Sequence, residues 1–247
     1  MTDQYVLWKN WQGLDFGHFE IEDSLNFRHE LNASGIDTVQ GLRVGELGYG
    51  NGVFAGWVTA EGGDWVGREA ILELQQRAAH AGFQVIAAQD AFTKIHGHEG
   101  FDLIVAFDVF EHLELSEIRL FLSEARSALR PGGHLLARFP SGDSPFSGAI
   151  YWGDATHRTL LGSSAVRQLA LEAGLEICQV RSPILPVWGL GLRRAARRTA
   201  IRLIQVLVFP FIRHAFIGRG DAIITPNMVI VLKKMGQQAL TAYHSPD

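Results

Sequence analysis

The sequence predicts an α/β fold with a doubly wound parallel sheet covered by helices on both faces. Short apolar runs rich in β-branched residues recur at intervals that leave room for a helix between them. The stretches between the early runs carry apolar residues at helical spacing, as residues 70–81 show. Regular alternation of strands with helices is typical of a parallel sheet with helices on both sides.

Seven apolar runs mark the expected strands. They are centred near Val44, Val66, Val85, Ile104, Leu135, Ile177 and Val229. Helices are predicted over residues 70–81 and 116–129, where apolar side chains recur three or four positions apart. A further helix is predicted over residues 163–174, which precede the sixth strand.

Length and composition allow one large domain with a substantial core. The 247 residues are 47% hydrophobic and only 19% charged, which excludes a disordered chain. The single cysteine, Cys178, excludes an internal disulfide or a thiolate zinc cage. Because the first ten residues also lack a secretion signal, we expect a cytoplasmic protein.

Residues 1–41 precede the first strand and form an aromatic N-terminal arm. Its aromatic side chains are Tyr5, Trp8, Trp11, Phe16, Phe19 and Phe27. Two roles are open for this arm: it either covers the mouth of a binding site or packs on the outside of the sheet.

Residues 186–220 form a basic segment between the last two strands. From Ile177 to Gly220 there are eight arginines and no Asp or Glu, although the whole chain has a net charge of −4. One basic segment on an acidic body argues against a nucleic-acid-binding protein and points to a local partner. As a helix, the segment places its arginines on one half of its circumference and apolar residues on the other.

Three roles are open for this basic segment. It is a helical excursion packed on the domain, a lid over the substrate, or a membrane contact through residues 190–212 at the inner face of the membrane. Its longest uncharged stretch, residues 203–212, has ten residues, fewer than the ~20 that cross a bilayer. If the segment contacts a membrane, we therefore expect it to lie on the surface and not to cross.

The first strand ends in a glycine loop with the pattern E-x-G-x-G-x-G, formed by Glu46, Gly48, Gly50 and Gly52. Ligands of such sheets bind beyond the carboxyl ends of the strands. The dinucleotide fingerprint needs a small residue where Val53 stands, so a pyrophosphate is not the expected ligand. A carboxylate at this position suits a ligand that carries an amino group.

Further acidic residues follow the second and third strands. Glu69 is placed to accept hydrogen bonds from ribose hydroxyls, which is the usual role of an acid at this position. Asp90 is placed to accept from the exocyclic amine of adenine. The loop and the two acids together describe a site for an adenosine that carries an amino acid.

The fourth strand begins a longer motif, F-D-x-I-x-x-x-D-V-x-E-H-L, over residues 101–113. Together with the glycine loop, it resembles the class I S-adenosylmethionine-dependent methyltransferases, particularly their small-molecule branch. An L-x-P-G-G-x-L-x pattern at 129–136 and a G-D-x-T-H loop at 153–157 extend the resemblance over residues 41–235.

The resemblance implies S-adenosylmethionine as the cofactor and a Rossmann-like sheet of seven strands. The sheet is mostly parallel with an antiparallel last strand, and the helical insert at 186–220 lies between strands six and seven. The methyltransferase domain then spans residues 42–235, and 236–247 form a flexible tail.

For the cofactor, the resemblance implies contacts from Glu46, Gly48, Tyr49, Gly50, Gly52, Glu69, Asp90, Ala91 and Asp108. Asp108 would lie near the sulfonium end. Tyr49 stands where relatives often have a small residue, so we expect it to crowd the methionine end. Glu69 replaces the common Asp and keeps the ribose contact.

The transfer to a hydroxyl acceptor calls for a general base. His157 is the first candidate, with Asp154 to orient its ring, and His112 is the second; alternatively, His157 only bonds the loop backbone. Asp108, Glu111 and His112 have the spacing to hold a divalent ion on one helical turn. Helix capping is the favoured account of these three, so no metal is predicted.

The expected activity is methyl transfer to a small-molecule acceptor, most simply to oxygen. The run R-F-P-x-G-D-S-P at 138–145 is similar to that of surface-polysaccharide enzymes, which makes a sugar or glycan hydroxyl the first acceptor. The basic insert would suit a phosphate-bearing or lipid-linked acceptor. Two alternatives stay open: a quinone or phenol O-methyltransferase near the membrane, and a scaffold that has kept the pocket without catalysis.

Overall fold

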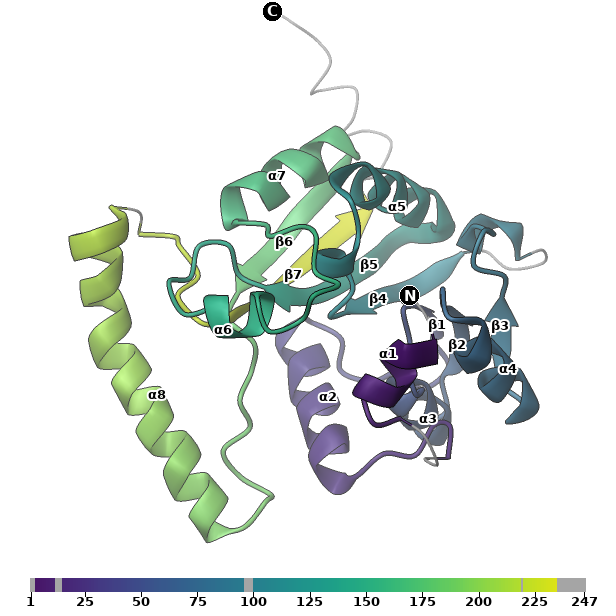
Figure 1. Cartoon of the computed structure of the whole chain (residues 1–247), viewed down its shortest axis with the longest axis horizontal. Coiled ribbons are helices and arrows are strands. Elements are labelled where there is room, and N and C mark those ends of the chain that lie inside the picture. The colour runs from purple at the N-terminus through teal and green to yellow at the C-terminus, as the bar shows by residue number, and fades with distance from the viewer. Residues whose placement is uncertain (1–2, 12–14, 96–99, 219, 235–247) are drawn as a thin grey trace, which may run out of the picture.

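A seven-stranded mixed sheet forms the centre of the protein in the computed structural model, which describes residues 3–11, 15–95, 100–218 and 220–234 (Figure 1). The strands are β1 (Arg43–Leu47), β2 (Asp64–Arg68), β3 (Gln84–Ile86), β4 (Phe101–Phe107), β5 (Leu129–Pro140), β6 (Leu175–Arg181) and β7 (Asn227–Lys234). Each lies on one of the seven predicted runs. The expected tail, 236–247, lies outside the described residues.

The sheet has the order β3-β2-β1-β4-β5-β7-β6. The first five strands pair in parallel, and β7 runs antiparallel to both β5 and β6. The predicted antiparallel last strand is therefore confirmed. Because strand order reverses between β1 and β4, the loops after these two strands diverge, which opens the usual ligand crevice.

Helices connect and cover the strands on both faces. They are α1 (Asp3–Trp8), α2 (Ile21–Ala33), α3 (Val53–Ala60), α4 (Leu72–His80), α5 (Leu115–Ala128), α6 (Gly148–Tyr151), α7 (Ser163–Glu172) and α8 (Leu192–Ile212), with short turns η1 (Phe92–Lys94), η2 (Phe110–His112) and η3 (Arg213–Ile217). In Figure 1, α5 and α7 lie above the strands and α2 and α3 below them. The three predicted helices correspond to α4, α5 and α7.

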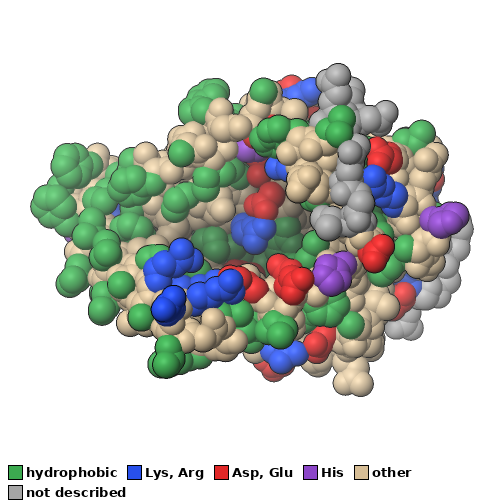
Figure 2. All heavy atoms as spheres, turned by 60° about the horizontal axis from the view of Figure 1, so that its bottom comes forward, with side chains coloured by type: hydrophobic (Ala, Val, Ile, Leu, Met, Phe, Trp, Pro, Cys, Tyr) green, Lys and Arg blue, Asp and Glu red, His purple; other side chains and the backbone are tan. Residues whose placement is uncertain are grey.

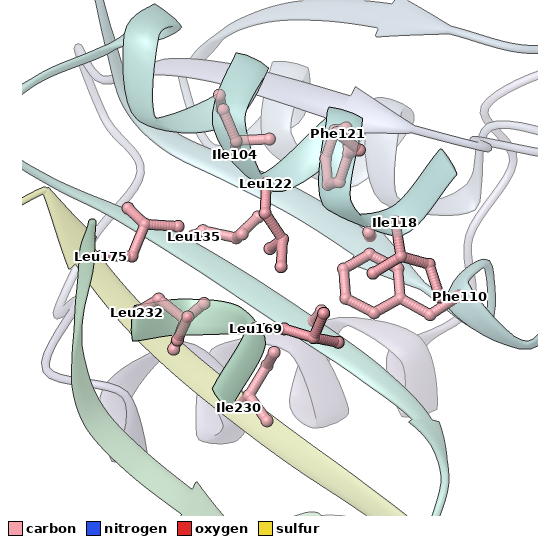
Figure 3. Close-up of a cluster of buried hydrophobic side chains, with 14 of the residues drawn as sticks. Ile104, Phe110, Ile118, Phe121, Leu122, Leu135, Leu169, Leu175, Ile230 and Leu232 are labelled. Carbon is pink, nitrogen blue, oxygen red and sulfur yellow. The ribbon is translucent and has the colours of Figure 1, made fainter. Parts of the chain in front are cut away.

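Two hydrophobic cores fill the space between the helices and the sheet. The first packs α5 and α7 against one face, where Ile118, Leu122 and Leu169 meet side chains of β4, β5 and β7 (Figure 3). The second packs α2, α3 and α4 against the other face. The central strands are apolar without alternation because both of their faces are buried.

The loop between β1 and α3 depends on glycine at its turns. Gly48 and Gly50 have positive φ angles of 68° and 55°. A Cβ on Gly48 would lie 2.6 Å from the side chain of Val109, and one on Gly50 would lie 2.8 Å from the Trp11 ring. Conformation and close approach therefore both require glycine here.

The N-terminal arm is part of the folded domain and covers the glycine loop. Val6 of α1 is fully buried, and Leu31 of α2 belongs to the second core. The Trp11 ring packs against Gly50, and the Phe16 ring packs against Gly52. The arm thus packs on one face of the sheet and also covers the glycine loop, so this packing agrees with both of its expected roles.

The insert between β6 and β7 contains α8, a helix of 21 residues followed by the π-helical turn η3. Figure 1 shows α8 at one edge of the molecule, joined to the sheet through extended segments. By length and composition alone, Leu192–Ile217 could cross a membrane. The apolar character thus continues beyond the ten-residue stretch into η3, while a peripheral contact stays a prediction.

Candidate functional site

A cavity lies beyond the carboxyl ends of β1, β2 and β4, with an empty volume of about 560 Å³. Gly48 and Gly50 of the glycine loop line it, together with Glu69 after β2 and His112 in η2. Tyr5 and Trp11 of the N-terminal arm close its outer side. We refer to it as the donor cavity.

A second cavity of about 960 Å³ adjoins the donor cavity and shares Asp108 and both arm aromatics with it. Its remaining wall comes from α2, β4 and α3, which present the aromatic side chains Phe27, Phe107 and Phe54. Charged side chains also line this space, and Figure 2 shows a surface hollow in which acidic and basic groups meet. We refer to it as the acceptor cavity.

Glu69 occupies the predicted position in the donor cavity. Its Oε1 accepts from the backbone N–H groups of Ala70 (2.8 Å) and Ile71 (3.1 Å), and its Oε2 accepts from Gly50 (3.1 Å). Burial raises the pKa of the Glu69 carboxyl, while these bonds oppose the rise. Since a carboxylate offers about four acceptor positions, three bonds leave room for a ribose hydroxyl.

Glu46 ends β1 on the side of the acceptor cavity. Its Oε2 accepts a hydrogen bond of 2.8 Å from the indole N–H of Trp65. Burial raises the pKa of the Glu46 carboxyl to about 8, although the bond from Trp65 opposes this. The group is therefore neutral in much of the population at pH 7 until a cation approaches it.

Tyr49 turns away from the donor cavity. Its ring packs edge-on against Phe16 and Trp65, with centroid distances of 5.6 Å and 5.3 Å. The core between the arm and β2 takes up much of the ring, but Tyr49 also lines the acceptor cavity beside Glu46, so its contact with the methionine end stays a prediction. Gly52, the last glycine of the motif, is the N-cap of α3 and lies under Phe16.

Asp90 and Ala91 lie in the segment between β3 and η1. The strand before them ends at Ile86, and a turn then carries Asp90 to an ion pair with Lys94. Ala91 becomes the N-cap of η1. These two residues are not among those that line the donor cavity, so their adenine contact stays a prediction.

Asp108 lies between the two cavities and holds an ion pair with Arg138 of β5. Its φ angle of 55° is uncommon for a residue other than glycine. Its backbone N–H donates to the carbonyl of Arg138 at 2.7 Å, which fixes this conformation. Arg138 also lines the acceptor cavity; it begins the R-F-P-x-G-D-S-P run, but the sequence analysis gave it no individual role.

His112 faces the donor cavity, and a chain of hydrogen bonds fixes its ring. Its Nδ1 lies 2.9 Å from Thr156 Oγ1, and Thr156 Oγ1 donates to Asp154 Oδ1 at 2.6 Å. The Tyr5 hydroxyl lies 3.4 Å from His112 Nε2. Burial lowers the pKa of His112 to about 4, so the ring is neutral at pH 7.

Asp154 is held as an anion at the far end of this chain. Burial acts to raise its pKa, but hydrogen bonds from the Thr156 hydroxyl and backbone, with the charges of His157 and Lys9, lower it overall. Lys9 of the arm lies 3.5 Å from Asp154 Oδ2. The carboxylate is therefore a constant acceptor for the Thr156 proton.

His157 is buried behind His112 and lines neither cavity. Its Nδ1 lies 2.7 Å from the carbonyl oxygen of Tyr151, and its Nε2 lies 3.8 Å from Asp154. The two histidine rings have a centroid distance of 4.7 Å. The geometry therefore reverses the predicted order of the bases: His112 faces the cavity, while His157 bonds the loop backbone.

Glu111, His112 and His157 bring ligand atoms within 4.8 Å of one another. This differs from the alternative metal set in the sequence, because Asp108 is paired with Arg138 and His157 takes its place. Both ring nitrogens of His112 already face hydrogen-bond partners. We therefore assign His112 to the hydrogen-bond chain and assign no metal.

The residues present fit S-adenosylmethionine. The glycine loop forms a cradle that a Cβ at Gly48 would fill, and buried Glu69 keeps an acceptor position free beside it. Glu46 and Asp108 supply carboxyl groups toward the adjoining cavity, where an amino group would need them. Thr156, Arg138 and Tyr5 complete the site. Thr156 and Arg138 lie in motifs that the sequence analysis quoted and Tyr5 lies in the aromatic arm, but none of the three was given a role there.

Comparison with known proteins agrees with this geometry. Residues 22–180, more than half of the chain, match a family described as "Methyltransferase domain". The ubiquinone biosynthesis O-methyltransferase of Nitrobacter winogradskyi is 27% identical over 125 residues, which are 47% of this chain and 46% of that protein. The match thus spans less than half of the relative's length.

Solved structures share the fold. A SAM-dependent methyltransferase from Archaeoglobus fulgidus superposes with a TM-score of 0.59 at 16% identity, covering 94% of this chain and 100% of that one. A TehB-like SAM-dependent methyltransferase from Corynebacterium glutamicum gives 0.56 at 16% identity, covering 94% and 97%. With the family match, these likenesses lead to one conclusion: the chain belongs to the methyltransferase family whose domain matches residues 22–180, and it has the fold of S-adenosylmethionine-dependent methyltransferases.

Proposed function

We propose that this methyltransferase acts on a hydroxyl oxygen of a small acceptor and that His112 is its general base. One observation carries the proposal. The bonds from Asp154 through Thr156 to His112 leave His112 Nε2 facing the donor cavity.

The direction of these bonds follows from the number of protons available. A threonine hydroxyl has one proton, and Thr156 gives it to the anion Asp154. Thr156 can then only accept from His112, so Nδ1 of His112 carries the ring proton. Nε2 therefore carries the ring's lone pair and accepts from the Tyr5 hydroxyl, which burial keeps protonated by raising its pKa; an acceptor hydroxyl would replace Tyr5 in this long bond.

Different residues bind the donor, exclude water and remove the proton during methyl transfer. When bound, S-adenosylmethionine supplies a methyl group activated by a sulfonium. Glu69 and the glycine loop hold the adenosyl portion, and Glu46 holds the amino group. Tyr5 and Trp11 of the N-terminal arm exclude water from the outer side of the donor cavity. His112 Nε2 takes the proton that the acceptor hydroxyl releases as its oxygen is methylated.

The lining of the acceptor cavity favours a flat aromatic acceptor, such as a phenol or quinol. Phe27, Phe54 and Phe107 line this space, and aromatic side chains pack well against a ring. The partial match to a ubiquinone biosynthesis O-methyltransferase supports the same class. The polar groups of the cavity, including Lys9 and Arg138, would bind ring substituents.

The phosphate-bearing sugar acceptor expected from the basic insert has less support. Arg194 and Arg198 bond Glu22 of α2, and Arg202 bonds the carbonyl of Leu185. These arginines are engaged within the protein and are not free to bind a phosphate. A glycan hydroxyl therefore remains a prediction to be compared directly with phenols.

The test is turnover of labelled S-adenosylmethionine with a panel of catechols, quinols, nucleotide sugars and lipid-linked sugars. We expect methylated phenol or quinol as product. With that acceptor, His112→Gln should lower kcat by about 10²-fold or more, the range for a general base. Thr156→Val should lower kcat with little change in KM, and Thr156→Ser should restore it because serine keeps the hydroxyl.

The pH dependence separates this role from a structural one. Because burial lowers the pKa of His112 to about 4, wild-type kcat should stay level as pH falls through the ordinary histidine range. His29→Gln is the matched control, since His29 is exposed on α2. Full turnover in His112→Gln, or equal losses in Thr156→Val and Thr156→Ser, would contradict the assignment; methylation of sugars alone would overturn the acceptor class.

A further inference from the structure

The outward face of α8 is apolar and lies open to solvent. Leu203, Leu207 and Phe211 recur every four residues, so they share one face of the helix, and they are 59%, 76% and 65% exposed. Phe216 in η3 extends this surface and packs edge-on against Phe211. Figure 2 shows many hydrophobic side chains on the left side of the molecule, where Figure 1 places α8.

The inward face of the same helix is tied to the body by arginines. Arg198 is buried, with its guanidinium on Glu22 of α2 (2.5 Å) and on the carbonyl of Pro186 (2.6 Å). Arg194 also bonds Glu22, at 2.7 Å. These bonds fix which face of α8 is turned outward.

Two further arginines remain on the outward side. Arg193 and Arg197 are exposed and form no hydrogen bond or ion pair within the ranges that the structure describes. They lie four residues apart at the start of the helix. At helical spacing they share a face with Ile204 and Phe211. No Asp or Glu occurs between residues 177 and 220 to neutralise them.

We propose that α8 docks this methyltransferase on the surface of an anionic lipid bilayer. The helix lies parallel to the surface with Leu203, Leu207 and Phe211 in the acyl region, and Arg193 and Arg197 contact lipid phosphates. The outward face combines apolar area with unpaired positive charge, and an anionic bilayer complements both.

The charge pattern favours a bilayer over a second copy of the chain. A self-complementary contact of two α8 helices would bring together two basic faces that carry no acid. The ties of Arg194 and Arg198 to Glu22 likewise favour a helix lying on the membrane. To cross it, the helix would have to break these bonds and carry their charges into the lipid.

Docking at α8 would bring the acceptor cavity close to the membrane. Glu22 of α2 pairs with the α8 arginines Arg194 and Arg198. The same helix, α2, also lines the acceptor cavity through Asn26 and Phe27. An amphipathic acceptor partitioned into the lipid would then reach the site along α2. Vesicle binding needs no acceptor, so its test is independent of the proposed reaction.

The experiment is co-sedimentation of the full chain with vesicles of phosphatidylcholine alone or mixed with phosphatidylglycerol. We expect binding to the mixed vesicles that high salt weakens. Leu207→Gln combined with Phe211→Gln should abolish it. Arg193→Gln with Arg197→Gln should weaken it about thirtyfold and reduce its salt dependence, from the energy of two basic residues near an anionic surface.

Matched controls lie on α5 and α7, where Leu120→Gln with Leu171→Gln removes two exposed leucines. Arg119→Gln with Arg167→Gln removes two exposed charges there. Both controls should bind vesicles like the wild type. Equal losses in tests and controls, or no binding to mixed vesicles, would overturn the proposal. Resistance to carbonate extraction would indicate a crossing helix instead, and a dimer dispersed by the α8 changes without vesicle binding would indicate a second copy.

Discussion

At the scale of single residues, the two strand-end carboxyls differ in how the protein holds them. Glu69 accepts three backbone hydrogen bonds, so its charge has local support. Glu46 has one bond, from Trp65, and burial raises its pKa to about 8. Glu46 is therefore the group whose charge state depends on the arrival of a cationic ligand.

We expect the affinity for S-adenosylhomocysteine to increase with pH toward about 8. Below its pKa the Glu46 carboxyl is neutral, and the ligand's ammonium prefers the ionised form, so each pH unit lost weakens binding by up to tenfold. Calorimetry over a pH series measures this. Glu46→Gln should bind more weakly and without the pH dependence; a wild-type affinity that is constant below pH 8 would exclude the role of Glu46.

At the scale of elements, the N-terminal arm completes the donor cavity. Three of its side chains reach the site: Tyr5 contacts His112, Lys9 pairs with Asp154, and Trp11 packs on Gly50. The carbonyl of Trp11 also accepts from Arg77 of α4 at 2.8 Å, which anchors the segment. The arm therefore acts as a cover that two hydrogen bonds and one ion pair hold to three separate parts of the domain.

Removing one ring from this cover tests its role. Trp11→Ala should weaken S-adenosylhomocysteine binding about tenfold, because it exposes the cavity and removes apolar contact area. Trp8→Ala is the control, since Trp8 lies on the same arm but is exposed and lines neither cavity. Calorimetry that finds equal affinities for the two variants would argue against a covering arm.

At the scale of the whole molecule, one sheet separates two cores and carries the site at its edge. Central strands such as β5 are buried on both faces and supply side chains to each core. Leu135 of β5 is fully buried beside Ile104 and Leu232 of the neighbouring strands. The rigidity of this centre holds the loops after β1, β2 and β4 in position.

Leu135→Ala should lower the free energy of unfolding by about 2–5 kcal/mol, the range for removing a buried leucine side chain. Urea unfolding followed by circular dichroism measures this change. Leu120→Ala on α5 removes the same atoms from an exposed position and should change stability little. Similar midpoints for both variants would show that the packing around Leu135 contributes less than its burial indicates.

The sequence by itself determined the seven strands, the main helices and the glycine loop. The strands and helices depend on side-chain periodicity, and the loop depends on the positive φ angles that glycine adopts without strain at positions 48 and 50. Both are local properties of the chain. The carboxyls Glu46 and Glu69 were predictable for the same reason, because each directly follows or ends a strand.

Only the tertiary structure decided which residues meet in the site. Thr156 and His112 are 44 residues apart, and Tyr5 and His112 are 107 apart, so no local pattern links them. The face on which α8 turns its arginines to Glu22 likewise depends on how distant segments pack. Hydrogen bonds between distant residues form only when the whole chain has folded, whereas strands and tight turns depend on residues that are neighbours in the sequence.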